Sequence, residues 1–215
     1  MDIICLTKSK PPAYFQQIAQ LHAAEIKHGV LPLLGNEFLA KLYSEMCRSP
    51  RNSIWIAIEK GKVLGFLAGC ADFSQSCRRL IWQSGFFLGW SALHSLSNPR
   101  VLIKLLSLLI YPFRKTGDRF GSPERHSSGT VRAELLAMAV HHEAHRQGIG
   151  RVLIASFEKS LSYWGVADGY WVATDSAQMV SNQFYLSLGF KPTGKVKHHD
   201  LVLQHYYKKL NGATG

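Results

Sequence analysis

The segment Val140–Arg151, VHHEAHRQGIGR, constrains the fold of this chain more than any other. A strand-length apolar run, Arg132–Val140, leads into it, and Ile149, Leu153 and Phe157 then recur at the spacing of one buried helical face. A strand that enters a helix through a glycine turn is the local unit of folds that mix strands and helices. The exposed amides at the start of such a helix, together with the helix dipole, favour an anionic ligand.

Two interpretations of this turn are open. Gly148 and Gly150 can let the backbone approach a phosphate closely, with Arg146 and Arg151 adding positive charge, or they can serve local chain geometry alone. The turn is not a Walker loop, because no Gly-Lys-Ser/Thr follows it, and Leu153 stands where a dinucleotide fingerprint needs its third glycine. The segment predicts a site for a phosphorylated ligand of another type.

The rest of the chain switches between helical and strand periods. Two helical patterns come first, and a strand hairpin around a tight turn follows them. After the glycine turn and its helix, the chain continues as strand, helix and strand. This order predicts an α/β (α+β) domain on a mixed sheet. The predicted segments are Ile3–Leu6, Tyr14–Leu21, Phe38–Met46, Ile54–Ile58, Val63–Gly69, Tyr170–Thr174, Val180–Leu188 and Leu201–Tyr207.

Length and composition favour one globular unit over residues 1–215. The chain has 25 Lys and Arg against 14 Asp and Glu, a net charge of +11, so nucleic acid, anionic lipid and phosphorylated cofactors are all compatible partners. Its four cysteines form no C-x-x-C pair, no secretory signal is visible, and no apolar run reaches the length of a spanning helix. From these three observations we expect a cytoplasmic location.

Residues 73–130 differ from the rest in composition and read as an insertion. Eight basic and two acidic residues there carry +6 of the net charge of +11. Within the insertion, 101–111 predicts a helix that is apolar except for a narrow stripe containing Arg100 and Lys104. That helix can pack on the domain, line an acceptor site or lie at an anionic membrane surface. Nucleic acid is not expected, because no recognised binding module accompanies the charge.

The segment His145–Gly150, HRQGIG, resembles the pyrophosphate loop of the GNAT acyltransferase superfamily, which reads Gln/Arg-x-x-Gly-x-Gly/Ala between the fourth strand and the third helix. His145 stands where that family usually has arginine or glutamine. Downstream, Ser181–Phe190, SNQFYLSLGF, is similar to the family's second signature, a tyrosine-bearing helix followed by Leu-Gly-Phe. The resemblance covers about residues 130–192. It implies a GNAT-like fold with a long insertion between the third and fourth strands.

The resemblance also implies an enzyme that binds acetyl-CoA and passes its acetyl group to an amine by direct attack. The amine must lose a proton and the departing thiolate gains one, so a base and an acid are needed near the thioester. Tyr185 matches the family's acid, and Glu134, on the strand before the loop, is the candidate base, acting directly or through a water. The alternatives are a core aromatic role for Tyr185 beside Phe184 and a solvent-facing strand position for Glu134.

The strand end and the loop are implied to hold the cofactor. The backbone amides of Ala139 and Val140 would align the pantetheine arm and polarise the thioester carbonyl. Asn182 is either a hydrogen-bond donor to the cofactor or an exposed helix residue. The predicted cofactor-binding residues are Met138, Ala139, Val140, His145, Arg146, Gln147, Gly148, Ile149, Gly150, Arg151 and Asn182.

A metal site is the weaker interpretation of His141, His142 and His145. Their order, H-H-E-A-H, is not H-E-x-x-H, and the approach to the glycine turn places them in a loop rather than on one helical face. We therefore expect no metal. The sequence as a whole predicts an acetyl-CoA-dependent N-acyltransferase acting on a small-molecule amine. Two alternatives stay open: a protein amine acetyltransferase, and a non-catalytic acyl-CoA-binding module that docks on a membrane.

Overall fold

The computed structural model describes residues 1–7, 11–26, 31–79, 132–198 and 201–210. Most of the insertion, including the helix predicted at 101–111, lies outside the described residues, and 73–79 at its start are helical. The elements are β1 (Asp2–Cys5), α1 (Pro12–Glu25), η1 (Leu31–Leu34), α2 (Asn36–Met46), β2 (Asn52–Glu59), β3 (Lys62–Cys70), β4 (Glu134–Val140), η3 (His142–Ala144), α6 (Ile149–Tyr163), β5 (Gly169–Asp175), α7 (Met179–Ser187), β6 (Lys191–His198) and β7 (Leu201–Lys209).

The strands form one sheet in the order β1-β2-β3-β4-β5-β7-β6. Every neighbouring pair is antiparallel except β4 and β5, which run parallel. A parallel pair needs a crossover, and α6 provides it between these two strands. The mixed sheet with its helices confirms the predicted architecture.

Two buried clusters lie on opposite faces of the sheet. Leu153 and Phe157 of α6 pack on one face, which we call the α6 face. Ile18 of α1 and Leu39 of α2 pack with Phe66 of β3 on the other, the α1–α2 face. Successive strand residues point to alternate faces, so the position of a residue in its strand decides which cluster it joins.

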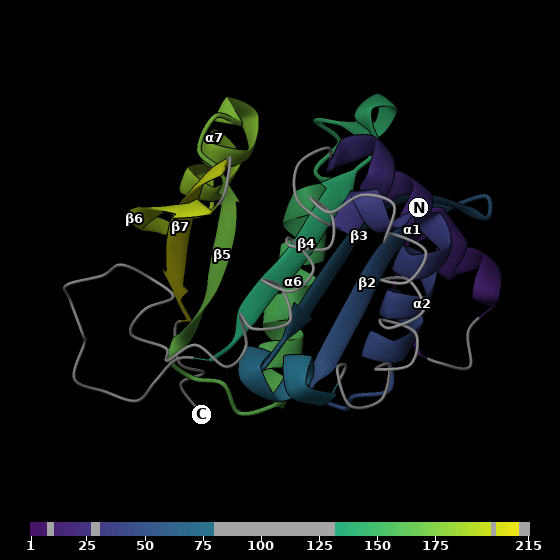
Figure 1. The fold of residues 1–215 in the computed structure, drawn as a ribbon, viewed down its shortest axis with the longest axis horizontal. Helices are drawn as coiled ribbons and strands as arrows, with labels where there is room; N and C mark the ends of the chain where they lie inside the picture. The colour runs from purple at the N-terminus through teal and green to yellow at the C-terminus, as the bar shows by residue number, and fades with distance from the viewer. Residues whose placement is uncertain (8–10, 27–30, 80–131, 199–200, 211–215) are drawn as a thin grey trace, which may run out of the picture.

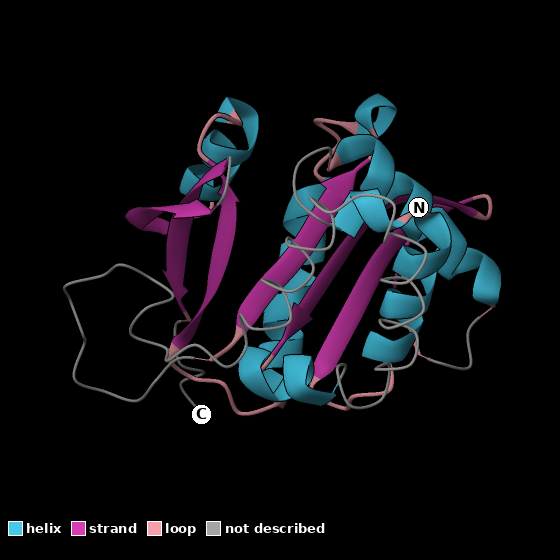
Figure 2. Cartoon of the chain, in the orientation of Figure 1, coloured by secondary structure: helices cyan, strands magenta, loops and turns pink. Residues whose placement is uncertain are grey.

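The parallel pair β4 and β5 separates soon after it begins. Only Glu134 pairs with Trp171 and Leu135 with Val172, both at the start of the strands. Figure 1 shows the two strands diverging toward their C-terminal ends. Figure 2 shows the short helix α7 at the C-terminal end of β5, on the far side of this divergence from α1 and α2. Among the described residues no helix is long and apolar enough to cross a membrane.

Candidate active site

The glycine turn forms an uncapped helix N-terminus directly after β4. Gly148 is the N-cap of α6 with φ +79, and no side chain caps the helix. The first turn of α6 carries no acidic residue. The amides of Ile149 and Gly150 therefore lack a carbonyl partner within the helix, as do the first amides of any α-helix. Arg146 and Arg151 are exposed beside these amides, so positive charge surrounds the donors.

Gly150 also has a packing role. A Cβ at this position would lie 2.9 Å from Cζ of Phe184 on α7, closer than real Cβ contacts come. Around Gly148, in contrast, a Cβ would meet no atom within 4 Å. The two glycines therefore have different structural roles. Gly148 adopts a left-handed backbone conformation, and Gly150 lets α6 approach α7.

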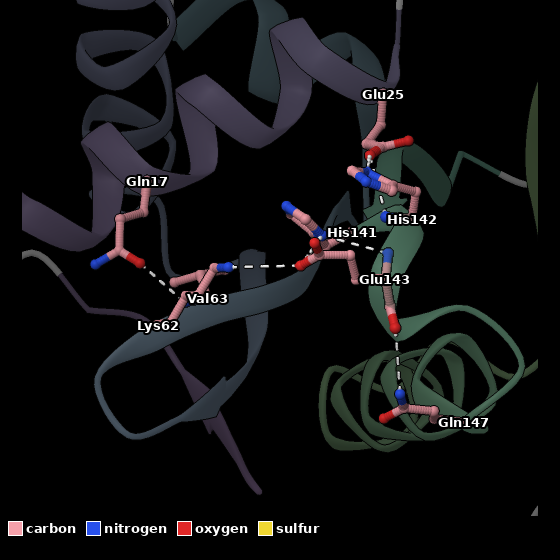
Figure 3. Close-up of polar contacts among 8 residues, drawn as sticks. All are labelled: Gln17, Glu25, Lys62, Val63, His141, His142, Glu143 and Gln147. Atoms are coloured by element: carbon pink, nitrogen blue, oxygen red, sulfur yellow. Dashed lines mark hydrogen bonds and ion pairs between the residues drawn. The ribbon is translucent and has the colours of Figure 1, made fainter.

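Side chains from α1 and the β2–β3 hairpin hold the loop that precedes α6 (Figure 3). Glu25 accepts hydrogen bonds from the His142 backbone N–H at 3.1 Å and pairs with its Nδ1 at 3.2 Å. Lys62 lies 3.9 Å from the carboxylate of Glu143, whose other close partner is Nδ1 of His141 at 3.6 Å. Sequence reasoning missed Glu25 and Lys62, because neither belongs to a motif and both contacts span long stretches of chain.

The histidines of this loop have protein partners. His141 and His142 stack with ring centroids 4.5 Å apart, and each faces a carboxylate as described above. Nε2 of His145 donates to the carbonyl of Val140 at 2.8 Å, which fixes the end of β4 against the loop. In the described part of the chain, no three His, Cys, Asp or Glu side chains gather as metal ligands would.

The register of β4 decides which backbone groups face the divergence. The His141 N–H donates to the Leu64 carbonyl at 2.8 Å, which makes this pair a hydrogen-bonded one. Because such pairs alternate along an antiparallel ladder, Ala139 opposite Phe66 is bonded to β3 as well. The backbone groups of Met138 and Val140 then point away from β3, toward β5. The predicted role of the Ala139 amide toward the pantetheine arm is therefore corrected, since this amide faces β3.

Tyr185 lies in an aromatic cluster on the α6 face. Its side chain is 6% exposed, and its ring centroid is 5.2 Å from that of Phe190, 5.5 Å from Phe184 and 5.9 Å from Tyr206. Burial raises the pKa of the Tyr185 hydroxyl, so the group stays protonated at neutral pH. Burial therefore keeps a proton on the hydroxyl and at the same time makes that proton harder to release.

Glu134 lies on the opposite face of the sheet. It pairs with Cys70 of β3, and Cys70 is two and four positions from Ala68 and Phe66, which both belong to the α1–α2 cluster. Side chains of directly paired residues share a face, so Glu134 points to the α1–α2 face. Burial raises the pKa of the Cys70 thiol, and the negative charge of Glu134 raises it further, which agrees with their being neighbours.

Asn182 has protein partners at both ends of its amide. Its Nδ2 donates to the carbonyls of Gln178 at 2.7 Å and Asp175 at 3.0 Å, and its Oδ1 accepts from the Tyr206 hydroxyl at 2.7 Å. These bonds join α7 to the end of β5 and to β7. Asn182 thereby fixes the helix that carries Tyr185.

With this geometry in place, the chain can be compared with known proteins. A family model described as an acetyltransferase (GNAT) domain matches residues 116–192. The matched segment is therefore similar to a GNAT acetyltransferase domain. The match includes the glycine turn, both diverging strands and α7. Among curated proteins none matches the chain.

Solved structures agree on the GNAT fold. NAA60 of Arabidopsis thaliana, in complex with a bisubstrate analogue, has 12% identity and a TM-score of 0.60, covering 99% of this chain and 100% of that one. Aminoglycoside 6'-acetyltransferase type Ii has 15% identity and a TM-score of 0.56, with 97% of each chain covered. The ribosomal-protein-S18-alanine N-acetyltransferase of Escherichia coli has 12% identity and a TM-score of 0.56, with 99% and 96% covered.

The similarity to GNAT acetyltransferases suggests which donor to consider. The donor of this family is acetyl-CoA, which carries a thioester at one end and phosphates at the other. In this chain, β4 and the uncapped start of α6 follow one another along the sequence, separated by the short η3 loop. The thioester and the phosphates of acetyl-CoA are likewise separated along the ligand.

Proposed function

We propose that the protein transfers the acetyl group of acetyl-CoA to the amine of a small molecule, at the divergence of β4 and β5. The observation that carries this proposal is the position of two side chains. Glu134 lies on the α1–α2 face, and Tyr185 lies in the cluster of the α6 face. An amine would lose its proton on the face of Glu134 and the thiolate would leave on the face of Tyr185, with the donor lying between the strands beyond the paired Glu134 and Trp171.

The backbone between the two faces would bind the donor. The backbone groups of Met138 and Val140 that point toward β5 would form hydrogen bonds with the pantetheine arm, as an added strand does. The first amides of α6 would bind the pyrophosphate, because they are uncapped and lie at the positive end of the helix dipole. Arg146 and Arg151 would pair with the phosphate charges.

The transfer follows from these positions. Glu134 takes a proton from the acceptor ammonium, directly or through a water, and the free amine attacks the thioester carbonyl carbon. The new C–N bond forms and the C–S bond breaks, the nitrogen loses its second proton to solvent, and the CoA thiolate receives the proton of the Tyr185 hydroxyl. The amide product and free CoA leave, Glu134 releases its proton to solvent, and the tyrosine regains one from solvent. No bond to the enzyme forms at any step.

Release of free thiol from acetyl-CoA tests the proposal. A panel of small amines is offered, together with a peptide carrying a free N-terminus and one carrying an internal lysine. Faster release with a small amine, and a matching acetylated product by mass spectrometry, supports the proposed class. Faster release with a peptide favours a protein amine acetyltransferase. Acetyl-CoA binding without acceleration by any amine favours the non-catalytic alternative.

Contact of the basic insertion with an anionic membrane, and a cytoplasmic location, stay predictions from sequence. The +6 charge of residues 73–130 is the feature that motivates the first. Co-sedimentation with phosphatidylserine vesicles tests it. Binding should weaken as salt rises, because exposed charges are screened over about 8 Å at physiological ionic strength. A lack of binding at low salt would contradict it.

A further inference from the structure

Five residues lie side by side in a row across five adjacent strands. Each is the direct partner of the next in the sheet register, so all five side chains share one face. Neighbouring strands are about 4.8 Å apart, so each residue is one such step from the next. The row consists of Cys70 on β3, Glu134 on β4, Trp171 on β5, Tyr207 on β7 and Lys191 on β6.

The row lies on the α1–α2 face, opposite Tyr185. Cys70 fixes this assignment, as shown above for Glu134. Tyr170 and Val172, on either side of Trp171 in β5, belong to the cluster of the α6 face, which places Trp171 on the other one. Two aromatic side chains therefore follow directly after the candidate base, on the side from which an acceptor would approach it.

The two aromatic rings are held in place. The ring centroids of Trp171 and Tyr207 are 4.9 Å apart at an interplanar angle of 47°. The Tyr207 hydroxyl donates to the Asp168 carbonyl at 2.8 Å. Gly169 makes room for this bond, since a Cβ there would lie 2.5 Å from the hydroxyl oxygen. Both rings are half-buried, and the ring contact and the Tyr207 hydrogen bond hold them in place.

We infer that Trp171 and Tyr207 form the floor of the acceptor site and select a primary amine carried on a flat apolar group, such as an arylalkylamine. This inference rests on the proposed function, in which Glu134 is the base. The carboxylate would hold the ammonium group, and the rings would bind the apolar body by stacking and by attraction of the cation to their π faces. The exposed Lys191 at the far end of the row disfavours a polyamine, whose second positive charge it would repel.

The test compares 2-phenylethylamine with ethanolamine and spermidine as acceptors. We expect kcat/KM for 2-phenylethylamine to be about tenfold or more above that of the other two, since one aromatic contact contributes up to about that factor beyond its buried area. Trp171→Leu should lower kcat/KM for 2-phenylethylamine by about three- to tenfold through a higher KM. Trp171→Phe, which keeps a ring, should recover most of the loss.

Two controls separate this inference from a folding defect. Trp164→Leu changes another half-buried tryptophan, one that packs against the cluster of the α6 face, and should leave the amine preference unchanged. The rise in melting temperature produced by acetyl-CoA should persist in Trp171→Leu. Equal kcat/KM for the three amines in the parent, or an unchanged preference in a folded Trp171→Leu, would overturn the inference.

Failure of the proposed function gives a different result. Acetyl-CoA would then leave the melting temperature unchanged and no amine would accelerate thiol release. In that case, binding of 2-phenylethylamine to the protein without acetyl-CoA tests whether the row of residues forms an amine site. A rise in melting temperature that Trp171→Leu abolishes supports the amine subsite, and no rise in the parent overturns it.

Discussion

At the scale of single residues, Tyr185 is the side chain whose chemistry depends most on its surroundings. Replacing it by phenylalanine keeps the ring in its cluster and removes only the hydroxyl. We expect kcat to fall by roughly 10² to 10⁴, the usual contribution of a positioned acid, with little change in acetyl-CoA affinity. Steady-state kinetics with the best acceptor measures the first quantity, and titration of acetyl-CoA measures the second.

Tyr206→Phe is the matched control for this change. It removes a hydroxyl from the same aromatic cluster, although one that donates to Asn182. The free energy of unfolding should decrease, while kcat of the folded variant should stay within a few-fold of the parent. An unaltered kcat in Tyr185→Phe would remove this hydroxyl from the mechanism.

For Glu134 we expect a defect that depends on pH. Glu134→Gln cannot accept the proton of the ammonium, so kcat/KM should fall by about 10² or more near neutrality. The deficit should shrink as the pH rises toward the pKa of the acceptor amine, because free amine then no longer needs the base. A pH profile of parent and variant measures this. A deficit that is constant with pH would instead indicate a structural role for Glu134.

At the scale of elements, the start of α6 is predicted to bind the phosphates of the donor. Changing both Arg146 and Arg151 to glutamate places negative charge beside the uncapped amides. Acetyl-CoA affinity should fall by about tenfold or more, since bonds between charged groups contribute about 1.5 to 3 kcal/mol each. Lys159→Glu makes the same charge change farther along α6, where it is exposed, and should leave the affinity nearly unchanged.

Thermal scans with excess acetyl-CoA measure this effect as well, because a ligand that binds only the native state raises the melting temperature. The shift seen in the parent should persist in Lys159→Glu and decrease in the double variant. Equal shifts in all three proteins would show that the phosphates bind elsewhere.

Most elements of the fold can be predicted from periodicity, and the exceptions have physical reasons. Among the described residues, α1, α2, α6, α7, the hairpin, β4, β5 and β7 lie where their apolar spacing predicts. Sequence analysis missed β6, in which Pro192 and Gly194 interrupt the strand pattern and the register shifts between them. The strand exists because β7 supplies a partner along its whole length, and such pairing leaves no local signal.

The candidate site, like the fold, can be predicted only in part from the sequence. The glycine turn and the positions of Glu134 and Tyr185 in their elements follow from the sequence. The orientation of the Ala139 amide does not, because it depends on the register of β4 against β3, which has no signal in the local sequence. The contacts of Glu25 with the β4–α6 loop likewise depend on how α1 packs.

At the scale of the whole molecule, two buried histidines make stability depend on pH. Burial lowers the pKa of His22 and of His205 from the ordinary value of 6.5 to about 4. As the pH falls below 6.5, the unfolded chain binds protons that the native protein does not, so the free energy of unfolding decreases until the pH reaches about 4. His22, which is 3% exposed, would contribute up to about 3 kcal/mol of this loss.

Urea unfolding at a series of pH values measures this dependence. His22→Gln should flatten part of the slope between pH 6.5 and 4 while keeping a polar partner for the Tyr43 hydroxyl. A slope that is the same in His22→Gln and the parent would contradict the assignment of a neutral, buried His22.

One measurement tests the central claim most directly, that the diverging strands hold acetyl-CoA between a base on one face and an acid on the other. The purified protein is given acetyl-CoA and the amine panel, and free thiol and acetylated amine are counted together. The account predicts equal amounts of both products, formed far faster than in Tyr185→Phe or Glu134→Gln. Thiol release that no amine accelerates, at the same rate in the parent and both variants, would contradict it.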